Sequence, residues 1–528
     1  MSAEHQAWIE NLLSAEAWPH PVEALKLVET HISWVILTGK YAYKIKKPVD
    51  LGFVNFTELE MRKYYCEEEL RLNRRFSEHL YLDVVTIRGS RLRPQIGGDG
   101  PILDYAVKMT QFNDKNLLSR LAARNQITPE HVDLLADEIA AFHRRAAVAD
   151  SATPWISVAA AVQPAFDNFT AILKLQRELN DQGPLGLPRP GEPPQVMELP
   201  RLIQLRRWTE SEVSRRRAVF EGRGARGMIR ECHGDLHLGN MFLTPEGRIV
   251  IFDGIEFCEE LRWIDIMCES AFTMMDLADR GFPGLAWRFL NRWLESTGDF
   301  EGLALLRFYL AYRAMVRAKV GIIRLQQANS EAGQNGSDQA LMSSLVKEVS
   351  GYVGLAESYT VQGQPCLWIT CGVSGSGKTF GSQSLVEQLG LIRLRSDVER
   401  KRLAGLEKGQ SATAALSQGI YSSEATERVY LHLMNVAKQL LQDGHSVLID
   451  ATFLKRSQRL PFRKLAEELG IPFQILWFDA DIQTLTNRIQ KRAALGKDAS
   501  DATVEVAEYQ LREFENFDNE ELKHVRPK

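Results

Sequence analysis

Residues 366–380 carry the sequence CLWITCGVSGSGKTF, an apolar run followed by a glycine-rich turn that ends in Lys378 and Thr379. The stretch fits the pattern GxxxxGK[ST], in which a strand precedes the turn and a helix follows it. Glycines let backbone N–H groups converge on a phosphate, and the helix N-terminus adds partial positive charge. We therefore predict a phosphate-binding loop with these contact residues: Gly372, Ser374, Gly375, Ser376, Gly377, Lys378 and Thr379.

The sequence around this loop predicts the domain that holds it. From about residue 364 to residue 528, strand-like and helical patterns alternate, which is typical of an α/β domain with a parallel sheet. The strand HSVLIDATF ends in Asp450, where a carboxylate can hold Mg²⁺ or its water, and the hydroxyl of Thr379 can hold the same ion; the alternative is that Asp450 is only a cap or turn residue. Asp397 and Arg400 follow the second predicted strand, in LIRLRSDVERKR, where a carboxylate can orient and deprotonate an alcohol. The alternative is that these two residues only begin a solvated, charged helix.

These motifs resemble P-loop kinases of the polynucleotide kinase, gluconate kinase and zeta-toxin kind. The spacing Asp397-x-x-Arg400 matches the polynucleotide kinase version, which implies that Asp397 is the catalytic base and that Arg400 contacts the substrate. The segment WFDADIQTLTNRIQKRAA resembles the strand and arginine-rich lid helix of such kinases. Arg488 and Arg492 stand four residues apart on one helix face, so the resemblance implies that both bind the phosphates of ATP. Simple solvation of this pair is the alternative.

The N-terminal half contains a second set of charged motifs. CHGDLHLGNMFL, followed by GRIVIFDGIEF, gives Asp235, Asn240 and Asp253 in that order. A kinase-type centre needs these types in this order: one Asp orients the acceptor hydroxyl, the Asn takes a metal ion, and a second Asp bridges the metals to the phosphates. The spacing Asp-x-x-x-x-Asn equals that of a protein-kinase catalytic loop. We predict a second site that uses ATP and Mg²⁺.

The form HGDxHxxN resembles the aminoglycoside phosphotransferase and choline kinase family, over roughly the first 330 residues. This resemblance implies that Asp235 is the catalytic base and that a lysine in the second strand of a hairpin binds the phosphates. Lys44 is the candidate, and Lys46 is its rival because alternate residues of a strand point the same way. The segment DYAVKMTQF is similar to the hinge that binds adenine, with backbone groups from Val107 to Met109.

A glutamate partner for this lysine is expected on a helix predicted at residues 57–76. Glu69 continues the apolar face of that helix, so it is preferred to Glu67 and Glu68. All three remain candidates at this stage.

Strand and helix patterns predict a small antiparallel sheet with one helix near the N-terminus, and the two resemblances imply an α+β, protein-kinase-like bilobal domain followed by an α/β P-loop NTPase domain. Residues 31–47 predict a β-hairpin, and residues 81–87 and 102–109 predict two further strands. The polar stretch 328–339 has the composition of a linker or mobile loop. The predicted boundaries are 1–330 for the kinase-like domain (small lobe about 25–112, large lobe about 113–330), 331–363 for a linker and connecting helix, and 364–528 for the P-loop domain.

Four further charged residues and a histidine lie near the catalytic motifs. We expect Asp265 to be structural and His237 to shape the catalytic loop. The acidic residues Glu256, Glu259 and Glu260 are expected to be a solvated face, with binding of a cationic acceptor as the alternative.

Composition narrows the class of protein. Hydrophobic residues make up 45% and charged residues 25% of the 528, as in soluble globular proteins. The net charge of -4 does not favour a nucleic-acid partner, because phosphate binding needs positive charge. The six cysteines have no CxxC spacing, and no apolar run reaches the length of a membrane span. We expect a cytoplasmic protein with reduced thiols and no membrane partner.

The whole chain resembles bacterial two-domain proteins that join an aminoglycoside phosphotransferase-like domain to a P-loop kinase. The resemblance implies an ATP- and Mg²⁺-dependent kinase with two sites, each acting on a hydroxyl of a small-molecule acceptor. One alternative is that the C-terminal domain phosphorylates the 5′-hydroxyl of a nucleic acid. Another is a regulatory protein in which bound nucleotide sets a conformation.

Overall fold

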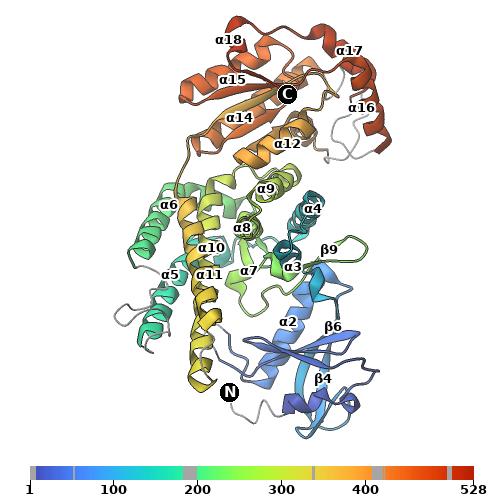
Figure 1. Ribbon diagram of the computed structural model, residues 1–528, viewed down its shortest axis with the longest axis vertical. Coiled ribbons are helices and arrows are strands. Elements are labelled where there is room, and N and C mark those ends of the chain that lie inside the picture. Colours follow the sequence, from blue (N-terminus) through green and yellow to red (C-terminus); the bar gives the residue numbers. More distant parts are fainter. Residues whose placement is uncertain are drawn as a thin grey trace. The chain divides into compact units, whose positions relative to one another are not determined.

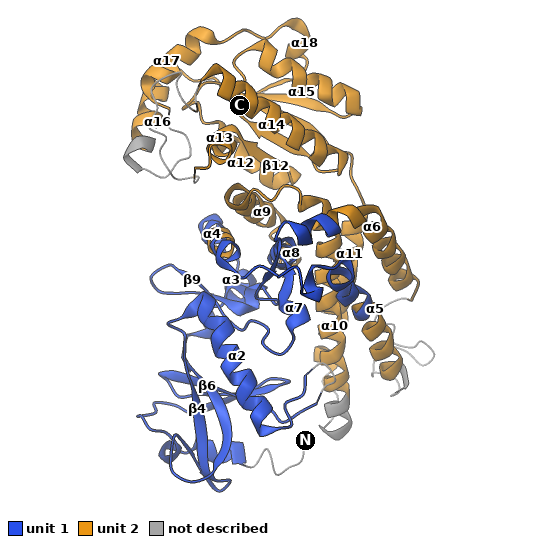
Figure 2. Cartoon of the chain, turned by 180° about the vertical axis from the view of Figure 1, so that it is seen from behind, with its two compact units in different colours: residues 1–134, 141–167, 220–276 blue, residues 135–140, 168–219, 277–528 orange. Residues whose placement is uncertain are grey.

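The computed structural model describes residues 8–50, 54–181, 199–335, 339–406, 420, 422–495 and 502–528. The chain divides into two units, which Figure 2 colours separately. Unit 1 consists of residues 1–134, 141–167 and 220–276, and unit 2 consists of residues 135–140, 168–219 and 277–528.

The N-terminal part of unit 1 is an antiparallel sheet in the order β1-β2-β3-β6-β4-β5. Its strands are β1 (Lys26–Glu29), β2 (Ser33–Leu37), β3 (Tyr41–Lys46), β4 (Tyr81–Ser90), β5 (Arg93–Ile96) and β6 (Ile102–Thr110). The predicted hairpin is confirmed, because β2 pairs antiparallel with β3 and places Val35 opposite Lys44. Both further predicted strands are confirmed as β4 and β6.

Helix α2 (Leu59–Ser77) lies along one face of this sheet (Figure 1). Its apolar side is buried because Cys66 packs with Tyr81 of β4 and Val107 of β6 in one core cluster. The predicted helix over 57–76 is therefore confirmed, and its inner face carries Glu69 into the unit without exposure to solvent.

The remaining part of unit 1 is built from short elements around the catalytic motifs. These are α3 (Leu118–Ala123), β7 (Ile229–Glu231), β8 (Met241–Leu243), β9 (Ile249–Ile251), α7 (Glu259–Arg262) and β10 (Trp263–Asp265). Four helices have residues in both units: α4 (Pro129–Arg145), α5 (Val158–Asp181), α6 (Leu199–Ala225) and α8 (Ile266–Asp279). Five 3-10 turns complete the list: η1 (Asn11–Leu13), η2 (Ala15–Ala17), η3 (Asp114–Asn116), η4 (Pro154–Ile156) and η5 (Leu238–Asn240).

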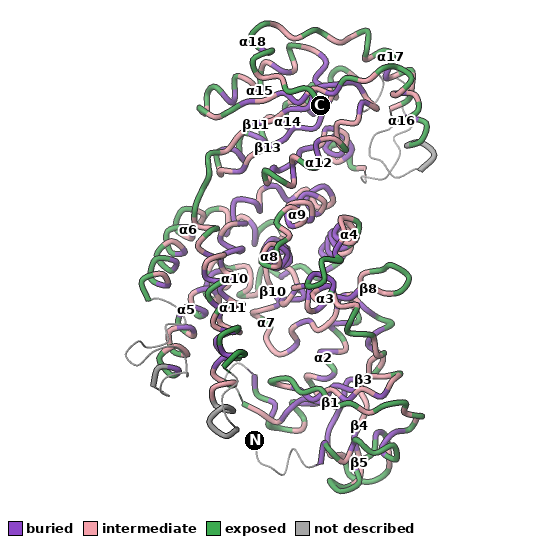
Figure 3. Tube along the Cα trace, in the orientation of Figure 1, coloured by how far each residue is buried: buried purple, intermediate pink, exposed green. Residues whose placement is uncertain are grey.

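Unit 2 contains a fully parallel sheet in the order β12-β13-β11-β14-β15. Its strands are β11 (Leu367–Cys371), β12 (Ile392–Arg395), β13 (Val447–Asp450), β14 (Phe473–Trp477) and β15 (Val525–Pro527). The central strands β11 and β13 are almost wholly buried (Figure 3), as expected for a sheet covered on both faces. The sheet confirms the predicted α/β class, and the antiparallel sheet with its helix confirms the α+β class.

Ten helices accompany this sheet in the described part of unit 2. They are α9 (Pro283–Thr297), α10 (Leu303–Asn335), α11 (Gln339–Thr360), α12 (Lys378–Leu389), α13 (Ser396–Leu403), α14 (Ser423–Gln442), α15 (Arg456–Leu469), α16 (Ile482–Leu495), α17 (Val504–Glu513) and α18 (Asn519–Leu522). With this strand order, the general right-handedness of β-α-β crossovers predicts α12 on one face of the sheet and α14 and α15 on the other. None of the helices in the described ranges is both long and apolar enough to cross a membrane.

The stretch predicted as a polar linker at 328–339 is partly helical. Helix α10 runs to Asn335, and α11 begins at Gln339, so the linker expectation is wrong for residues 328–335. Alanine, glutamate and glutamine in this stretch are good helix formers and there is no proline, so polar composition did not end the helix. The domain boundaries at 330 and 364 stay predictions.

Candidate functional site

The phosphate-loop motif lies between β11 and α12, as its pattern requires. Lys378 and Thr379 begin α12, and Gly372 follows the last residue of β11. Gly372 has a φ of 148°, and a Cβ there would lie 2.5 Å from the backbone oxygen of Phe478, so no side chain fits. The loop therefore presents bare backbone at its start, the surface that a phosphate needs for close approach.

The two predicted metal ligands of this site are in contact. The hydroxyl of Thr379 donates to Oδ2 of Asp450 at 2.6 Å, and Asp450 is 5% exposed. The sheet order explains the contact, because β13 pairs directly with β11 and carries Asp450 to the same edge. A hydroxyl and a carboxylate are hard oxygen donors, so these residues fit Mg²⁺.

Other side chains converge on the same loop. Lys378 Nζ donates to the backbone oxygen of Val373 at 2.8 Å, within the loop. Arg488 of α16 donates to the backbone oxygen of Ser376 at 2.8 Å, so one predicted lid arginine lies on the phosphate loop. The side chain of the other, Arg492, lies outside the described residues.

Sequence reasoning missed a contact from α17. The side chain of Gln510 accepts a hydrogen bond from the backbone N–H of Ser374 at 2.7 Å. A single glutamine on a helix carries no motif, so the sequence held no signal for it. When a phosphate binds, one of its oxygens can accept from this loop N–H group in place of the Gln510 amide oxygen.

Asp397 and Arg400 have different surroundings on α13. Asp397 is half-buried in the first turn of the helix, directly after β12. Arg400 is 9% exposed and donates to the backbone oxygen of Ile420 at 2.8 Å and to Thr426 Oγ1 at 3.2 Å. These two bonds hold α13 to the start of α14, so Arg400 supports the helix that carries Asp397.

The catalytic loop of unit 1 lies around a short hairpin. Strands β8 and β9 pair so that Asn240 just precedes one strand and Asp253 just follows the other. The backbone N–H of Phe252 donates to the backbone oxygen of Asn240 at 3.0 Å, which fixes the two ends together. Asn240 Nδ2 donates to Oδ2 of Asp235 at 3.1 Å, so two of the three predicted residues are in direct contact.

Asp253 has an unusual backbone. Its φ is +65°, a left-handed conformation that costs free energy in a residue other than glycine. The hydroxyl of Tyr81 accepts a hydrogen bond from its backbone N–H at 3.0 Å, and Asn73 Oδ1 accepts from Gly254 at 2.8 Å. Neither Tyr81 nor Asn73 was found from the sequence, because both lie far from the motif in the chain.

Both candidate lysines contact the same glutamate. Lys44 Nζ lies 2.8 Å from Glu69 Oε1 and 2.5 Å from Asp253 Oδ1, whereas Lys46 Nζ lies 2.8 Å from Glu69 Oε2 and also pairs with Glu256. Burial alone would raise the pKa of Glu69, but the two lysines outweigh it and lower the pKa to about 2. Burial alone would lower the pKa of Lys44, but Asp253 and Glu69 raise it well above its usual value.

For Glu256, this cluster corrects both readings of the acidic residues after Asp253, whereas Glu259 is exposed, as a solvated face predicts. Glu256 is 4% exposed and paired with Lys46, so it is neither on a solvated face nor available to a cationic acceptor. Burial is the main cause that raises the pKa of Glu256. Glu259 pairs instead with Arg262 at 3.1 Å.

Met109 lies inside a strand rather than in a hinge. It is opposite Ala42 of β3 and opposite Tyr81 of β4, so strands cover both edges of its backbone. Strand β6 ends at Thr110, and residues 111–113 are the first to leave the sheet. The role of Met109 in binding adenine stays a prediction.

A buried carboxylate holds the start of the catalytic loop. Glu269 Oε1 accepts from the backbone N–H of Gly234 at 2.9 Å and from that of His233 at 2.5 Å, and Oε2 accepts from His143 Nε2 at 2.8 Å. Burial would raise the pKa of Glu269, but the hydrogen bond from His143 and the loop N–H groups lower it to about 2. We refer to His143 and Glu269 as the loop clamp.

Cys232 lies beside the clamp, and the three side chains together resemble a metal site in composition. Burial raises the pKa of Cys232 well above its usual value, which keeps the thiol protonated and makes it a poor ligand. The carboxylate of Glu269 is already occupied by three donors. The cluster therefore fits a hydrogen-bonded clamp better than a metal centre.

Asp265 and His237, which we expected to have structural roles, both make contacts that fit such roles. Asp265 is buried in a two-point ion pair with Arg223, with Oδ1 at 2.6 Å from the guanidinium, and also accepts from the N–H of Met267. His237 accepts from the N–H of Gly239 at 3.0 Å, within the catalytic loop, and lies 3.4 Å from Asp235.

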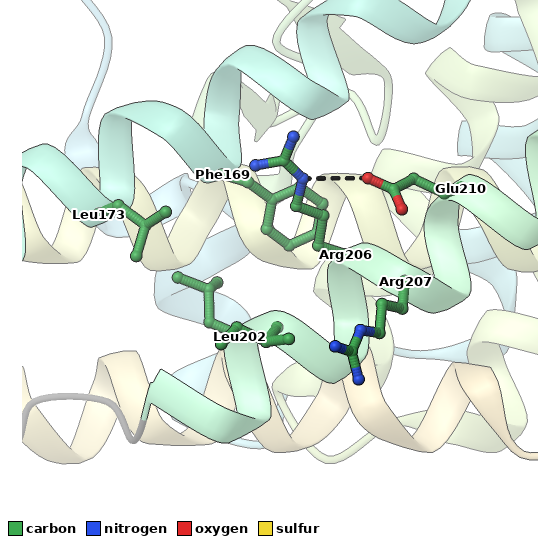
Figure 4. Close-up of a pocket in the computed structure, with 7 residues that line it drawn as sticks. Phe169, Leu173, Leu202, Arg206, Arg207 and Glu210 are labelled. Carbon is green, nitrogen blue, oxygen red and sulfur yellow. Dashed lines mark hydrogen bonds and ion pairs between the residues drawn. The ribbon is translucent and has the colours of Figure 1, made fainter.

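A hollow between α5 and α6 lies apart from these motifs (Figure 4). Its volume is about 270 Å³, and it is lined by Phe169, Leu173, Leu202, Ile203, Arg206, Arg207 and Glu210. Arg206 and Glu210 form an exposed ion pair at its rim. No predicted site residue lines it.

The fold and the site residues define a class of protein. A phosphate loop followed by a hydroxyl–carboxylate metal pair, and a catalytic loop with Asp, Asn and a second Asp, are the parts of phosphoryl-transfer enzymes. The chain is a phosphotransferase of the kinase type, with a nucleotide-binding P-loop domain in its C-terminal part.

Comparison with known proteins agrees with this class. Residues 367–517 match the family model described as AAA domain, which confirms the predicted P-loop domain. A protein of Mycobacterium tuberculosis, described as uncharacterized, is 28% identical over 491 residues, which cover 92% of this chain and 90% of the relative. An adenylyl-sulfate kinase of Myxococcus xanthus is 29% identical over 136 residues, 25% of this chain and 68% of that protein.

One solved structure is similar over the N-terminal part. It is a choline/ethanolamine kinase family protein from Mesorhizobium loti, 11% identical, with a TM-score of 0.36. The likeness covers 67% of this chain and 99% of that chain.

Proposed function

We propose that the chain is an ATP- and Mg²⁺-dependent kinase with two sites, each transferring the γ-phosphoryl group to a hydroxyl of a small-molecule acceptor. One observation carries this proposal: in each unit, a carboxylate proposed to bind Mg²⁺ contacts a second residue that is proposed to bind the ATP phosphates or the metal. In unit 1, Asp253 meets Lys44 at 2.5 Å; in unit 2, Asp450 meets Thr379 at 2.6 Å.

In the first site, the carboxylate of Asp235 orients the acceptor hydroxyl and takes its proton as the phosphoryl group arrives. Asn240 fixes the Asp235 carboxylate through its amide N–H, while Lys44 places its ammonium on the ATP phosphates. Asn240 and Asp253 hold Mg²⁺, which when bound neutralises charge on the phosphates.

In the second site, Asp397 has the role of the base. Lys378 turns from the backbone oxygen of Val373 to the β- and γ-phosphates, and Arg488 adds positive charge from α16. Thr379 and Asp450 hold the metal. Arg400, the proposed contact to the acceptor, also holds the helix of Asp397 in place.

The acceptors belong to the class of small alcohols. Adenylyl sulfate is one compound to try at the second site, because a kinase named for it is 29% identical over 136 residues. The net charge of -4 supports a small molecule over a nucleic acid.

The experiment is acceptor-dependent ADP formation by the full-length protein. Pools of sugars, amino alcohols, nucleotides including adenylyl sulfate, and 5′-hydroxyl oligonucleotides are tested with Mg²⁺ and with excess chelator. We expect Mg²⁺-dependent turnover with a small-molecule pool. Turnover with oligonucleotides alone would replace the small-molecule acceptor by a nucleic acid, and ATP binding without turnover in any pool would favour a nucleotide-gated regulator.

A further inference from the structure

Helix α9 forms hydrogen bonds with the edge strand of the parallel sheet in unit 2. The side-chain oxygen of Asn291 accepts from the backbone N–H of Arg393 at 2.7 Å, and its Nδ2 donates to the backbone oxygen of Leu391 at 2.9 Å. One amide side chain therefore takes the place of a neighbouring strand along the exposed edge of β12. Such a contact fixes α9 in register with the sheet.

Glu295 lies one helical turn beyond Asn291, on the same face of α9. Its Oε1 lies 3.1 Å from Arg393 and its Oε2 lies 3.3 Å from Arg395. Arg393 and Arg395 are two apart on β12, so both side chains leave the strand on the same side. The side chain of Glu295 is only 4% exposed, so this carboxylate and its two partners interact with little screening by water.

Each arginine reaches a different part of the phosphate-loop site. Arg393 donates to the backbone oxygen of Thr379 at 3.2 Å, in the first turn of α12. Arg395 Nε lies 3.9 Å from Oδ2 of Asp450, the oxygen that accepts from the Thr379 hydroxyl. Each carboxylate oxygen of Glu295 therefore contacts an arginine that in turn lies beside a proposed metal ligand.

We propose that Glu295 is a positioning residue for the C-terminal site, which holds Arg395 at a distance from Asp450 so that this carboxylate stays available to Mg²⁺. The inference rests on the kinase function proposed for that site. Arg395 lies at 3.9 Å from Asp450, longer than a direct hydrogen bond, and at 3.3 Å from Glu295. Without the Glu295 charge, the guanidinium of Arg395 can turn toward Asp450, whose Oδ2 lies 3.9 Å from its Nε, and compete with the cation.

The test measures Mg²⁺ dependence of nucleotide binding, with a non-hydrolysable ATP analogue and the full-length protein. The parent protein and all variants carry Lys44→Met, which weakens nucleotide binding at the first site. Adding Lys378→Ala to this parent measures the nucleotide binding that does not come from the second site. The variants compared with this parent are Glu295→Gln, Glu295→Gln with Arg395→Gln, and Arg292→Gln. Arg292 is the matched control, because it lies on the same helix and pairs with Asp137 at 2.6 Å instead of with the sheet.

We expect Glu295→Gln to raise the Mg²⁺ concentration for half-maximal binding about fivefold or more, while affinity for the analogue in chelator stays within about twofold. Removing Arg395 as well should return the Mg²⁺ requirement to that of the parent, and Arg292→Gln should not change it. Thermal unfolding of each variant separates loss of fold from loss of positioning.

Three results would overturn the inference. They are an unchanged Mg²⁺ requirement in Glu295→Gln, an equal rise in Arg292→Gln, and no recovery when Arg395 is also replaced. A parent protein that binds the analogue no better than its Lys378→Ala derivative would instead remove the proposed function of this site, and the inference with it.

Discussion

At the scale of single residues, the two lysines of β3 have similar positions but different partners. Lys44 bridges Glu69 and Asp253, and Asp253 is a candidate metal ligand. Lys46 bridges Glu69 and Glu256 in a site without solvent exposure. From the second contact of each lysine, we propose that Lys44 binds phosphates and that Lys46 contributes to stability.

Replacement of Lys44 by Met should lower kcat at the first site by about a hundredfold or more, because an ammonium on the phosphates is lost in a folded protein. Replacement of Lys46 by Met leaves two buried carboxylates with one cation and should cost about 3 kcal/mol or more in stability. Steady-state kinetics and thermal unfolding of both variants check this. Greater loss of stability in the Lys44 variant would contradict the assignment.

The hydroxyl of Thr379 can be tested in the same way. Thr379→Val removes the oxygen that meets Asp450 at 2.6 Å, so we expect a Mg²⁺ requirement about tenfold higher. Thr379→Ser keeps the oxygen and serves as the control. Mg²⁺ titrations of ATP turnover that give the same curve for valine and serine would exclude the hydroxyl as a ligand.

At the scale of elements, the loop clamp links α8 to the catalytic loop. Glu269 ties two backbone N–H groups of the loop to a helix, and His143 of α4 holds the other carboxylate oxygen. A loop that carries a catalytic base needs such support, because small displacements of the base lower the rate.

The clamp gives unit 1 an acid-sensitive contribution to stability. The pKa of Glu269 falls from 4.5 to about 2 on folding, so its contribution is complete above about pH 4.5 and is lost as the pH falls toward 2. Glu269→Gln should therefore be less stable than the natural protein at pH 7, by an amount on the order of 3 kcal/mol, and the difference should shrink at pH 3. Thermal unfolding midpoints at the two pH values measure it. A difference of equal size at both would contradict the lowered pKa.

Much of this element-level structure could be predicted from the sequence. The strand, turn and helix around Lys378 follow from the glycine pattern and apolar run, and the β2–β3 hairpin follows from its β-branched residues. The contacts of Gln510, Tyr81 and Glu269 could not be predicted. Each depends on a residue far away in the chain that only tertiary packing brings to the site.

The linker expectation at 328–339 was wrong for a related reason. Polar composition predicts exposure to solvent, but an exposed segment of helix-forming residues can still be helical. Helix α10 extends through part of this stretch, to Asn335.

At the scale of the whole molecule, one chain carries two sets of proposed phosphotransfer residues, and each set lies within its own unit. The M. tuberculosis relative covers 92% of this chain, so the combination of both parts is present in another protein. Two complete sets predict two activities that can be removed one at a time. A single shared site predicts that either change removes all activity.

The most direct test compares acceptor-dependent ADP formation in the natural protein, Asp235→Asn and Lys378→Ala. Asp235→Asn is nearly isosteric and removes only the proposed base of the first site, and Lys378→Ala removes the phosphate lysine of the second. The account predicts that each variant loses turnover with one acceptor by about a hundredfold or more and keeps turnover with the other. Loss of all turnover in both variants, or full turnover in both, would contradict two independent kinase sites.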